Sequence, residues 1–179
     1  MENKLKGISM AAALALITVP MFGQAMPPKG SLSDRVRHEL VMLPYYNIFD
    51  DLSYSVDNTG TVTLSGDVTQ PIVKDEAGRV VKKVEGVATV VNNIKVLPLS
   101  PMDNRIRAAT YRAIFGGSSP LYRYSMGAVP SIHIIVDNGH VTLKGVVANK
   151  FDRNVAYMRA NGVAGVFSVT NDLLVQGKS

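Results

Sequence analysis

The chain of 179 residues contains one pattern twice, and this duplication limits its possible folds more than any other feature. Five short matches recur in the same order, at offsets between 70 and 80 residues. They pair Asp34–Arg37 with Asn104–Arg107, Val56–Asn58 with Val136–Asn138, Val62–Gly66 with Val141–Gly145, Gly86–Ala88 with Gly162–Ala164, and Asn93 with Asn171. A repeat of this kind predicts one small structural unit in tandem, with Pro98–Pro101 as the linker.

Each copy reads as helix, strand, strand, helix, strand. The first helices are predicted to begin near Ser33 and Asp103, which are good N-caps, and the second at Pro71 and near Lys150. Apolar residues at helical spacing predict the inner faces: Val36, Leu40, Leu43, Ile106, Ala109 and Ala113, then Val73, Ala77, Val80, Val81, Val84, Phe151, Val155 and Met158. The order predicts an α+β fold of two αββαβ modules, each a three-stranded mixed sheet with two helices on one face.

The hairpin turn fixes the strand register in the second copy. Asn138-Gly139 is typical of a two-residue type I′ turn, so Asp137 should face His140. The first copy has one residue more, at 58–60, which predicts a bulged turn.

This register divides the side chains of each hairpin between two faces. Those predicted to face the helices are Ile134, Val136, Val141 and Leu143, and in the first copy Tyr54, Val56, Val62 and Leu64. The opposite face would carry His133, Ile135, Asp137, His140, Thr142 and Lys144, and in the first copy Ser55, Thr61 and Thr63. We therefore expect each sheet to be covered on one face only.

The N-terminus has the layout of a secretory signal. Lys4 and Lys6 precede an apolar run over 8–22, and Gly23-Gln24-Ala25 supplies small residues for cleavage. An ordinary N-terminal core helix is the alternative. The predicted organisation is a signal peptide over 1–25, cleaved after Ala25, and modules over 31–98 and 102–176. No later segment is apolar enough to span a membrane.

Composition excludes several classes of function. The chain has no cysteine, which removes disulfides, thiol nucleophiles and thioether-linked lipid anchors. Hydrolase, phosphate-loop and zinc-protease motifs do not occur in the sequence, so we expect neither an enzyme nor a cofactor. The αββαβ order also suits KH modules, but these need a Gly-x-x-Gly loop that the sequence lacks, so nucleic acid is not an expected partner.

The duplicated module, with Val-Thr-Leu-x-Gly closing each hairpin and Gly-Val-x-x-Val before the last strand, resembles the BON domain family. The matching residues are Gly66, Gly145, Gly86, Gly162, Asn93 and Asn171, all at structural positions. The resemblance implies no catalytic residue. It implies a periplasmic, envelope-associated protein that binds phospholipid surfaces, in a family with a member induced by high osmolarity.

Charge and aromatic residues favour the second copy as the lipid-binding part. Residues 100–179 carry 9 basic and 4 acidic side chains, whereas residues 26–99 carry 8 and 9. The candidate contacts with an anionic lipid surface are Arg105, Arg112, Arg123, Tyr122 and Tyr124. The alternatives are that the arginines are only solvated, and that the aromatic residues of both copies pack between the modules.

Three other interpretations stand beside lipid binding. His133, His140 and Asp137 could approach each other near the hairpin of the second copy, but they lack a third strong ligand, so no metal site is predicted. The exposed sheet faces and strand edges could instead bind envelope proteins, as in a chaperone-like module. An abundant stress protein without a specific ligand is a third reading.

Overall fold

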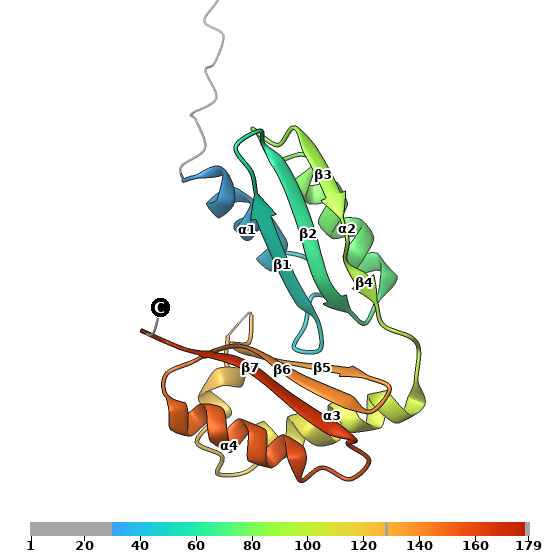
Figure 1. The fold of residues 1–179 in the computed structure, drawn as a ribbon, viewed down its shortest axis with the longest axis vertical. Coiled ribbons are helices and arrows are strands. Elements are labelled where there is room, and N and C mark those ends of the chain that lie inside the picture. The colour runs from blue at the N-terminus through green and yellow to red at the C-terminus, as the bar shows by residue number, and fades with distance from the viewer. Residues whose placement is uncertain (1–29, 128, 178–179) are drawn as a thin grey trace, which may run out of the picture.

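The computed structural model describes residues 30–127 and 129–177, and the predicted signal peptide lies outside them. Two modules follow each other along the chain (Figure 1). The first module contains α1 (Leu32–Val41), β1 (Asp51–Val56), β2 (Thr61–Val68), α2 (Pro71–Val81), β3 (Thr89–Asn92) and β4 (Lys95–Val96). The second contains α3 (Pro101–Phe115), the 3₁₀ helix η1 (Tyr122–Ser125), β5 (Ile132–Asp137), β6 (His140–Val147), α4 (Lys150–Asn161) and β7 (Ser168–Val175).

Both sheets are mixed and share one topology. In the first module β2 pairs antiparallel with β1 and parallel with β3 and β4. In the second, β6 pairs antiparallel with β5 and parallel with β7. The predicted α+β fold of two tandem modules is therefore confirmed. The third strand of the first module is interrupted between Asn92 and Lys95, so it forms the two short strands β3 and β4.

The turns confirm the predicted register. Asn138 and Gly139 have φ of 51° and 80°, as a type I′ turn requires, and Asp137 pairs with His140. In the first module Gly60 has φ 81°, and its hairpin closes through a hydrogen bond from the Asp57 N–H to the Thr61 carbonyl.

The first helices begin earlier than predicted. Ser31 caps α1 by accepting from the N–H of Asp34, whose carboxylate accepts in return from the N–H of Ser31. Ser100 caps α3 by accepting from the N–H of Asp103. Ser33 and Asp103 therefore lie inside the helices, because serines two or three residues earlier satisfy the first backbone donors.

Asp103 does not cap α3 but binds the turn between β5 and β6. Its carboxylate is buried and accepts from the backbone N–H groups of Asn138 and Gly139, at 3.0 and 2.8 Å. The only acidic side chain of α3 is thus directed at the β5–β6 turn, and it fixes the helix to the hairpin.

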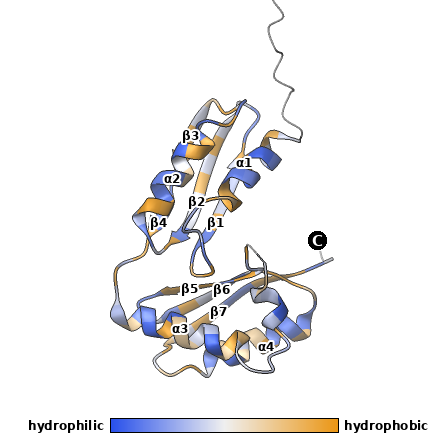
Figure 2. Ribbon diagram, turned by 180° about the vertical axis from the view of Figure 1, so that it is seen from behind, coloured by the Kyte–Doolittle hydropathy of each residue, from blue (hydrophilic) through white to orange (hydrophobic). Residues whose placement is uncertain are grey.

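The helices are amphipathic, with hydrophobic and hydrophilic residues alternating around them in Figure 2. The inner face of α4 differs from the prediction, because Phe151 and Met158 are 67% and 62% exposed. Val155 packs on the sheet as predicted, together with Ala156 and Ala160 in place of the other two predicted residues. The small alanines let the helix lie close to the strands, and the two large side chains point outward.

The asparagine correspondence between the modules also needs correction. Asn171 corresponds to Asn92, and not to Asn93, because the two occupy the same register position beside Leu143 and Leu64. Both side-chain amides donate to a carbonyl of the preceding helix, at 3.0 and 2.9 Å. They tie the last strand to the second helix in each module.

The glycine correspondence is shifted in a similar way. Gly86 has φ +89° and its structural equivalent is Gly165, with φ +88°, rather than Gly162. Gly162 is the C-cap of α4 and has φ −82°. Gly66 and Gly145 do correspond, with φ of +119° and +115°.

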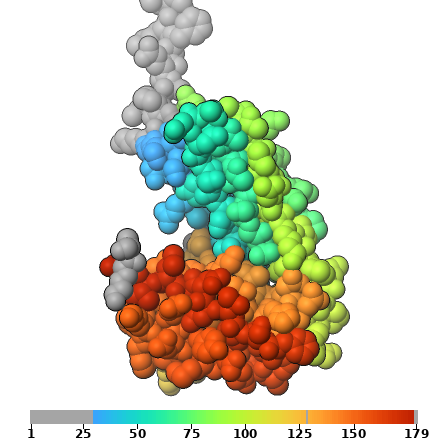
Figure 3. All heavy atoms as spheres, in the orientation of Figure 1, coloured from blue at the N-terminus to red at the C-terminus, as the bar shows by residue number. Residues whose placement is uncertain are grey.

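The first module covers the β5 side of the outer face of the second sheet, so the expectation of a one-sided sheet is wrong at β5 (Figures 1 and 3). At β7 the expectation holds, because the outward side chains of Ser168, Thr170, Asp172 and Leu174 are exposed. The loop before β1 inserts Ile48 into the core of the second module, and the Ile134 N–H donates to the Ile48 carbonyl at 2.8 Å. His133 and Ile135, predicted to be open to solvent, are buried. This placement agrees, for the first copy, with the alternative that the aromatic segments pack between the modules.

Three ion pairs also join the modules, the longest of them between Lys144 and Asp67 at 4.0 Å. Lys144 on β6 lies 2.8 Å from Asp51, and Lys95 on β4 lies 2.7 Å from Asp137. Because Lys144 and Asp51 are both partly buried, their attraction is less screened than that of a surface pair.

Candidate functional site

Helix α3 presents a basic surface. Arg105 and Arg112, seven residues apart, are exposed and form no ion pair within the described residues. Met102 lies three residues before Arg105 on the same side of the helix, and it is 53% exposed. With Asp103 buried, no acidic side chain of α3 offsets the two arginines.

The segment after α3 carries the other three candidates, and the structure separates them. Helix η1 packs against α3 and leaves Tyr122 54% exposed, with Met126 also exposed just beyond it. Tyr124 is only 8% exposed and belongs to the core of the second module. Tyr124 is therefore corrected from a surface contact to a packing residue.

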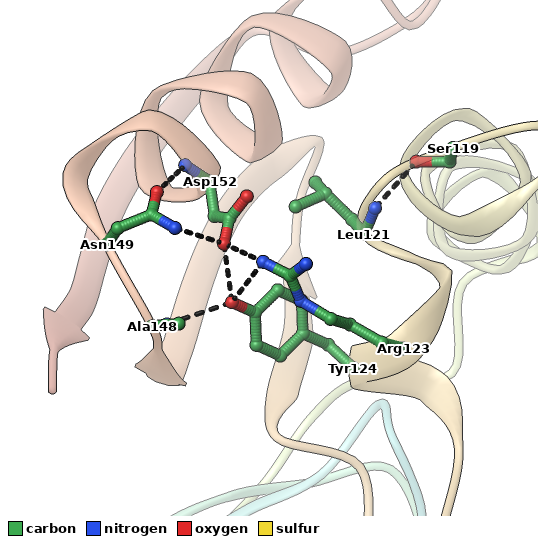
Figure 4. A network of polar contacts seen from close by, with 7 residues as sticks. All are labelled: Ser119, Leu121, Arg123, Tyr124, Ala148, Asn149 and Asp152. Carbon is green, nitrogen blue, oxygen red and sulfur yellow. Dashed lines mark hydrogen bonds and ion pairs between the residues drawn. The ribbon is translucent and has the colours of Figure 1, made fainter.

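A polar network holds Tyr124 in place (Figure 4). Its hydroxyl donates to the Asp152 carboxylate at 2.6 Å and accepts from the Ala148 N–H at 2.8 Å. The same carboxylate accepts from Asn149 and forms an ion pair with Arg123. The network connects η1 to the end of β6 and the start of α4.

Arg123 is thus partly neutralised. Its guanidinium lies 4.9 Å from the centre of the Tyr124 ring, and hydrogen bonds to Tyr124 and Asp152 raise its pKa. Although its side chain is 54% exposed, its charge is balanced by the buried Asp152 carboxylate. Arg105 and Arg112 therefore carry most of the uncompensated charge among the predicted contacts.

Replacing Tyr124 with phenylalanine should lower the free energy of unfolding by about 1–3 kcal/mol, because the Ala148 N–H and the buried Asp152 both lose a partner. Urea unfolding measures this loss. The matched control is Tyr122→Phe, which removes an exposed hydroxyl and should change stability by less than about 0.5 kcal/mol. Equal losses in the two variants would contradict the assignment of Tyr124 to the network.

The three residues considered for metal binding have other partners or surroundings. Asp137 pairs with Lys95, and His140 hydrogen-bonds to Ser168 at 2.7 Å. His133 is stacked on Tyr46 between the modules, with ring centroids 5.6 Å apart. Within residues 30–127 and 129–177, no group of three or more side chains of the metal-binding types comes together.

The buried His133 makes the contact between the modules sensitive to acid. Burial lowers its pKa below 6.5, against the opposite effect of Asp51 and Asp50, and its cross-strand neighbour is Lys144. The folded state binds a proton on His133 less readily than the unfolded chain does. The contribution of His133 to the free energy of unfolding is therefore fully present above the pKa of histidine in the unfolded chain, about 6.5, and is lost as the pH falls below it.

We expect the free energy of unfolding to fall between pH 7 and pH 5, and His133→Phe to reduce this fall because phenylalanine keeps the stack on Tyr46 without titrating. Urea unfolding at both pH values measures it. The matched control is His38→Gln, which replaces an exposed histidine of α1. An unchanged pH dependence in His133→Phe would show that another group is responsible.

A duplicated αββαβ module with a structural glycine at the hairpin defines the class of protein. The sequence matches the BON domain over residues 29–98 and 125–177, and the chain belongs to this family. The second match begins after α3, so the basic helix lies outside the matched residues. BON domains are generally non-enzymatic modules of periplasmic or envelope proteins.

Comparison with curated proteins gives no match. Among solved structures, the chain is similar to CdsD, a structural protein of the type III secretion system of Chlamydia trachomatis, with 14% identity and a TM-score of 0.31 over 80% of this chain and 91% of that one. The C-terminal domain of CdsD gives 14% identity and a TM-score of 0.32 over 83% and 99% of the two chains.

None of the helices in the described part of the chain has the length and apolar character needed to cross a membrane.

Proposed function

We propose that this chain is a non-enzymatic protein of the cell envelope whose second module binds anionic phospholipid surfaces through α3. The observation that carries the proposal is the basic surface of α3, where Arg105 and Arg112 are exposed and unpaired while Asp103 is buried. Residues 100–179 have a net charge of +5 and residues 26–99 of −1, which favours the second module as the side that meets the lipid.

Charge alone gives weak binding. Each basic side chain near an anionic leaflet contributes ~1 kcal/mol. Two or three such contributions correspond to a dissociation constant above the millimolar range, which is weak binding. The exposed Met102, Tyr122 and Met126 add apolar area that can enter the interface beside the arginines. Binding then combines attraction to the headgroups with shallow insertion.

Cosedimentation with vesicles tests this function. We expect the protein to sediment with vesicles rich in phosphatidylglycerol, to bind less as salt rises, and to stay in solution with pure phosphatidylcholine. Equal binding to the two kinds of vesicle, or no binding at any salt concentration, would reject it.

Export is proposed from the N-terminal pattern. Mass spectrometry of the protein from a periplasmic extract should find a mature chain that begins at Met26. A chain that retains residues 1–25 in the cytoplasm would reject export. The link to envelope or osmotic stress rests on the family resemblance.

Binding of envelope proteins is the second candidate function, supported by the exposed Phe151 and Met158 on α4. Pull-down from an envelope extract distinguishes the two functions. Partners that stay bound after detergent has removed the lipid, and that are lost in Phe151→Ser/Met158→Ser, favour the protein partner.

A further inference from the structure

A hollow of about 460 Å³ lies between the modules, on the side of α3 that faces the first module. Its volume is within the range of small-molecule sites. Three segments line it: the loop before β1, the start of α2, and one face of α3. The lining residues are Asn47, Ile48, Phe49, Thr69, Gln70, Asn104, Arg107 and Ala108.

A buried guanidinium lines this hollow without an ion-pair partner. Arg107 is 5% exposed, donates to the Asn104 side chain at 2.7 Å and to the Val136 carbonyl at 2.6 Å, and has no carboxylate within 4.0 Å among the described residues. Its Nε is buried and has no hydrogen-bond partner. A buried cation with a free donor is unfavourable until an anion approaches it.

The surrounding charges favour an anion with a single negative charge. Burial lowers the pKa of Arg107, and Asp103, Asp50 and Asp137 oppose this effect from a distance. Asp50 is buried beneath the lining, where it accepts hydrogen bonds from the Thr69 N–H and hydroxyl at 2.7 and 2.8 Å. A dianionic phosphate would be repelled by this carboxylate more strongly than a carboxylate ligand would.

The rim supplies a neutral hydrogen-bonding group. Gln70 is exposed at the N-cap position of α2, and its side chain makes no capping hydrogen bond. Its amide is therefore available to a ligand that enters beside Arg107.

The hollow continues along α3 into an apolar region. A second hollow of about 390 Å³ shares Ile48, Phe49 and Ala108 with the first and extends to Tyr111 and Arg112. Phe49 and Tyr111 meet edge to face across it, with ring centroids 6.4 Å apart. The buried cation at one end thus adjoins an apolar surface from both modules.

We propose that this groove binds a small amphipathic anion, a carboxylate attached to an apolar group. The carboxylate pairs with Arg107, and the apolar group lies against Phe49 and Ala108. Two sources share this chemistry, a free fatty acid and the carboxyl terminus of a peptide. Arg112 borders both this groove and the proposed membrane surface, but Arg107 and Gln70 at the charged end of the groove do not belong to that surface. Substitution of Gln70 therefore tests the groove separately from the proposed function.

Isothermal titration of the purified protein tests the site with two pairs of probes. The first pair is octanoate and octanamide, and the second is acetyl-Ala-Ala-Phe with a free and with an amidated terminus. We expect at least one carboxylate to bind, and its uncharged counterpart to bind about tenfold or more weakly. The pair that shows the difference identifies the source.

Gln70→Glu is the informative variant, because Arg107 also fixes α3 to β5 and its loss would disturb the fold. A carboxylate on the rim should weaken binding of the carboxylate probe about threefold, while vesicle binding stays unchanged. Arg105→Gln is the control, since it removes a charge from α3 outside the groove. No binding at millimolar probe, equal binding of charged and uncharged probes, or equal effects of the two variants would overturn the proposal.

Discussion

Replacing Gly145 with alanine should destabilise the second module by more than about 3 kcal/mol. Gly145 lies on β6 opposite Ile132, with φ +115°, and an added Cβ would lie 2.1 Å from the Ser131 carbonyl oxygen. The Ser131 oxygen belongs to the backbone directly before β5 and cannot rotate away as a side chain could, so relief of the clash requires the backbone at the start of the β5–β6 pairing to move. Thermal and urea unfolding measure the loss.

Gly117→Ala is the matched control for this prediction. Gly117 also has positive φ, +62°, but an added Cβ there would meet nothing within 4 Å. The cost should be about 1–2 kcal/mol, from the left-handed conformation alone. If Gly145→Ala cost no more than Gly117→Ala, close approach of the strands would not be the reason for this glycine.

The second large effect concerns vesicle binding. The double variant Arg105→Gln/Arg112→Gln should reduce partition onto phosphatidylglycerol vesicles about 30-fold, because two contributions of ~1 kcal/mol are lost and each 1.4 kcal/mol is a factor of ten. Both side chains are exposed and unpaired in the described structure, so the fold should keep its stability.

A control with the same change of charge separates local contact from overall attraction. Arg37→Gln/Lys82→Gln removes two exposed charges from the first module. These positions lie on α1 and after α2, away from α3 (Figure 1), and at physiological salt the screening length is about 8 Å. The control should keep vesicle binding within about threefold of the parent. Equal loss in both double variants would mean that net charge decides binding.

Local patterns predicted the elements and the hairpin register well. The Asn138-Gly139 turn sets the pairing of β5 and β6 because few residues adopt positive φ at two successive positions. The shifted asparagine and glycine correspondences have a different cause. Short identical strings do not show where one copy has insertions relative to the other. The strand register shows that Asn92 is the counterpart of Asn171, and the positive φ shows that Gly165 is the counterpart of Gly86.

The packing of the two modules could not be predicted from one module's pattern, although one signal was present. Residues Ile132–Val136 are apolar except for His133, a run typical of a strand buried on both faces, whereas Asp51–Val56 alternates. That run predicts a cover on the outer sheet face but does not say which segment supplies it. Tyr46 contributes to this cover by stacking on His133, and it lies 87 residues earlier in the chain, a separation at which no local rule applies.

The candidate site was predicted in part. Charge counting indicated α3, and the exposed arginines lie there, but it could not show that Arg123 is balanced by Asp152 or that Tyr124 is buried. Both outcomes depend on contacts between η1 and α4 that form only in the folded module. The same holds for Arg107, whose isolation from carboxylates depends on where the first module sits.

The most direct test of the membrane-binding surface is residue-resolved. Amide signals of the isotope-labelled protein can be recorded with bicelles that contain phosphatidylglycerol and a spin-labelled lipid. Binding through α3 predicts strongest broadening around Met102, Arg105 and Arg112, with Tyr122 next, and little in the first module. Broadening centred on Phe151 and Met158 of α4, or on the first module, would contradict it.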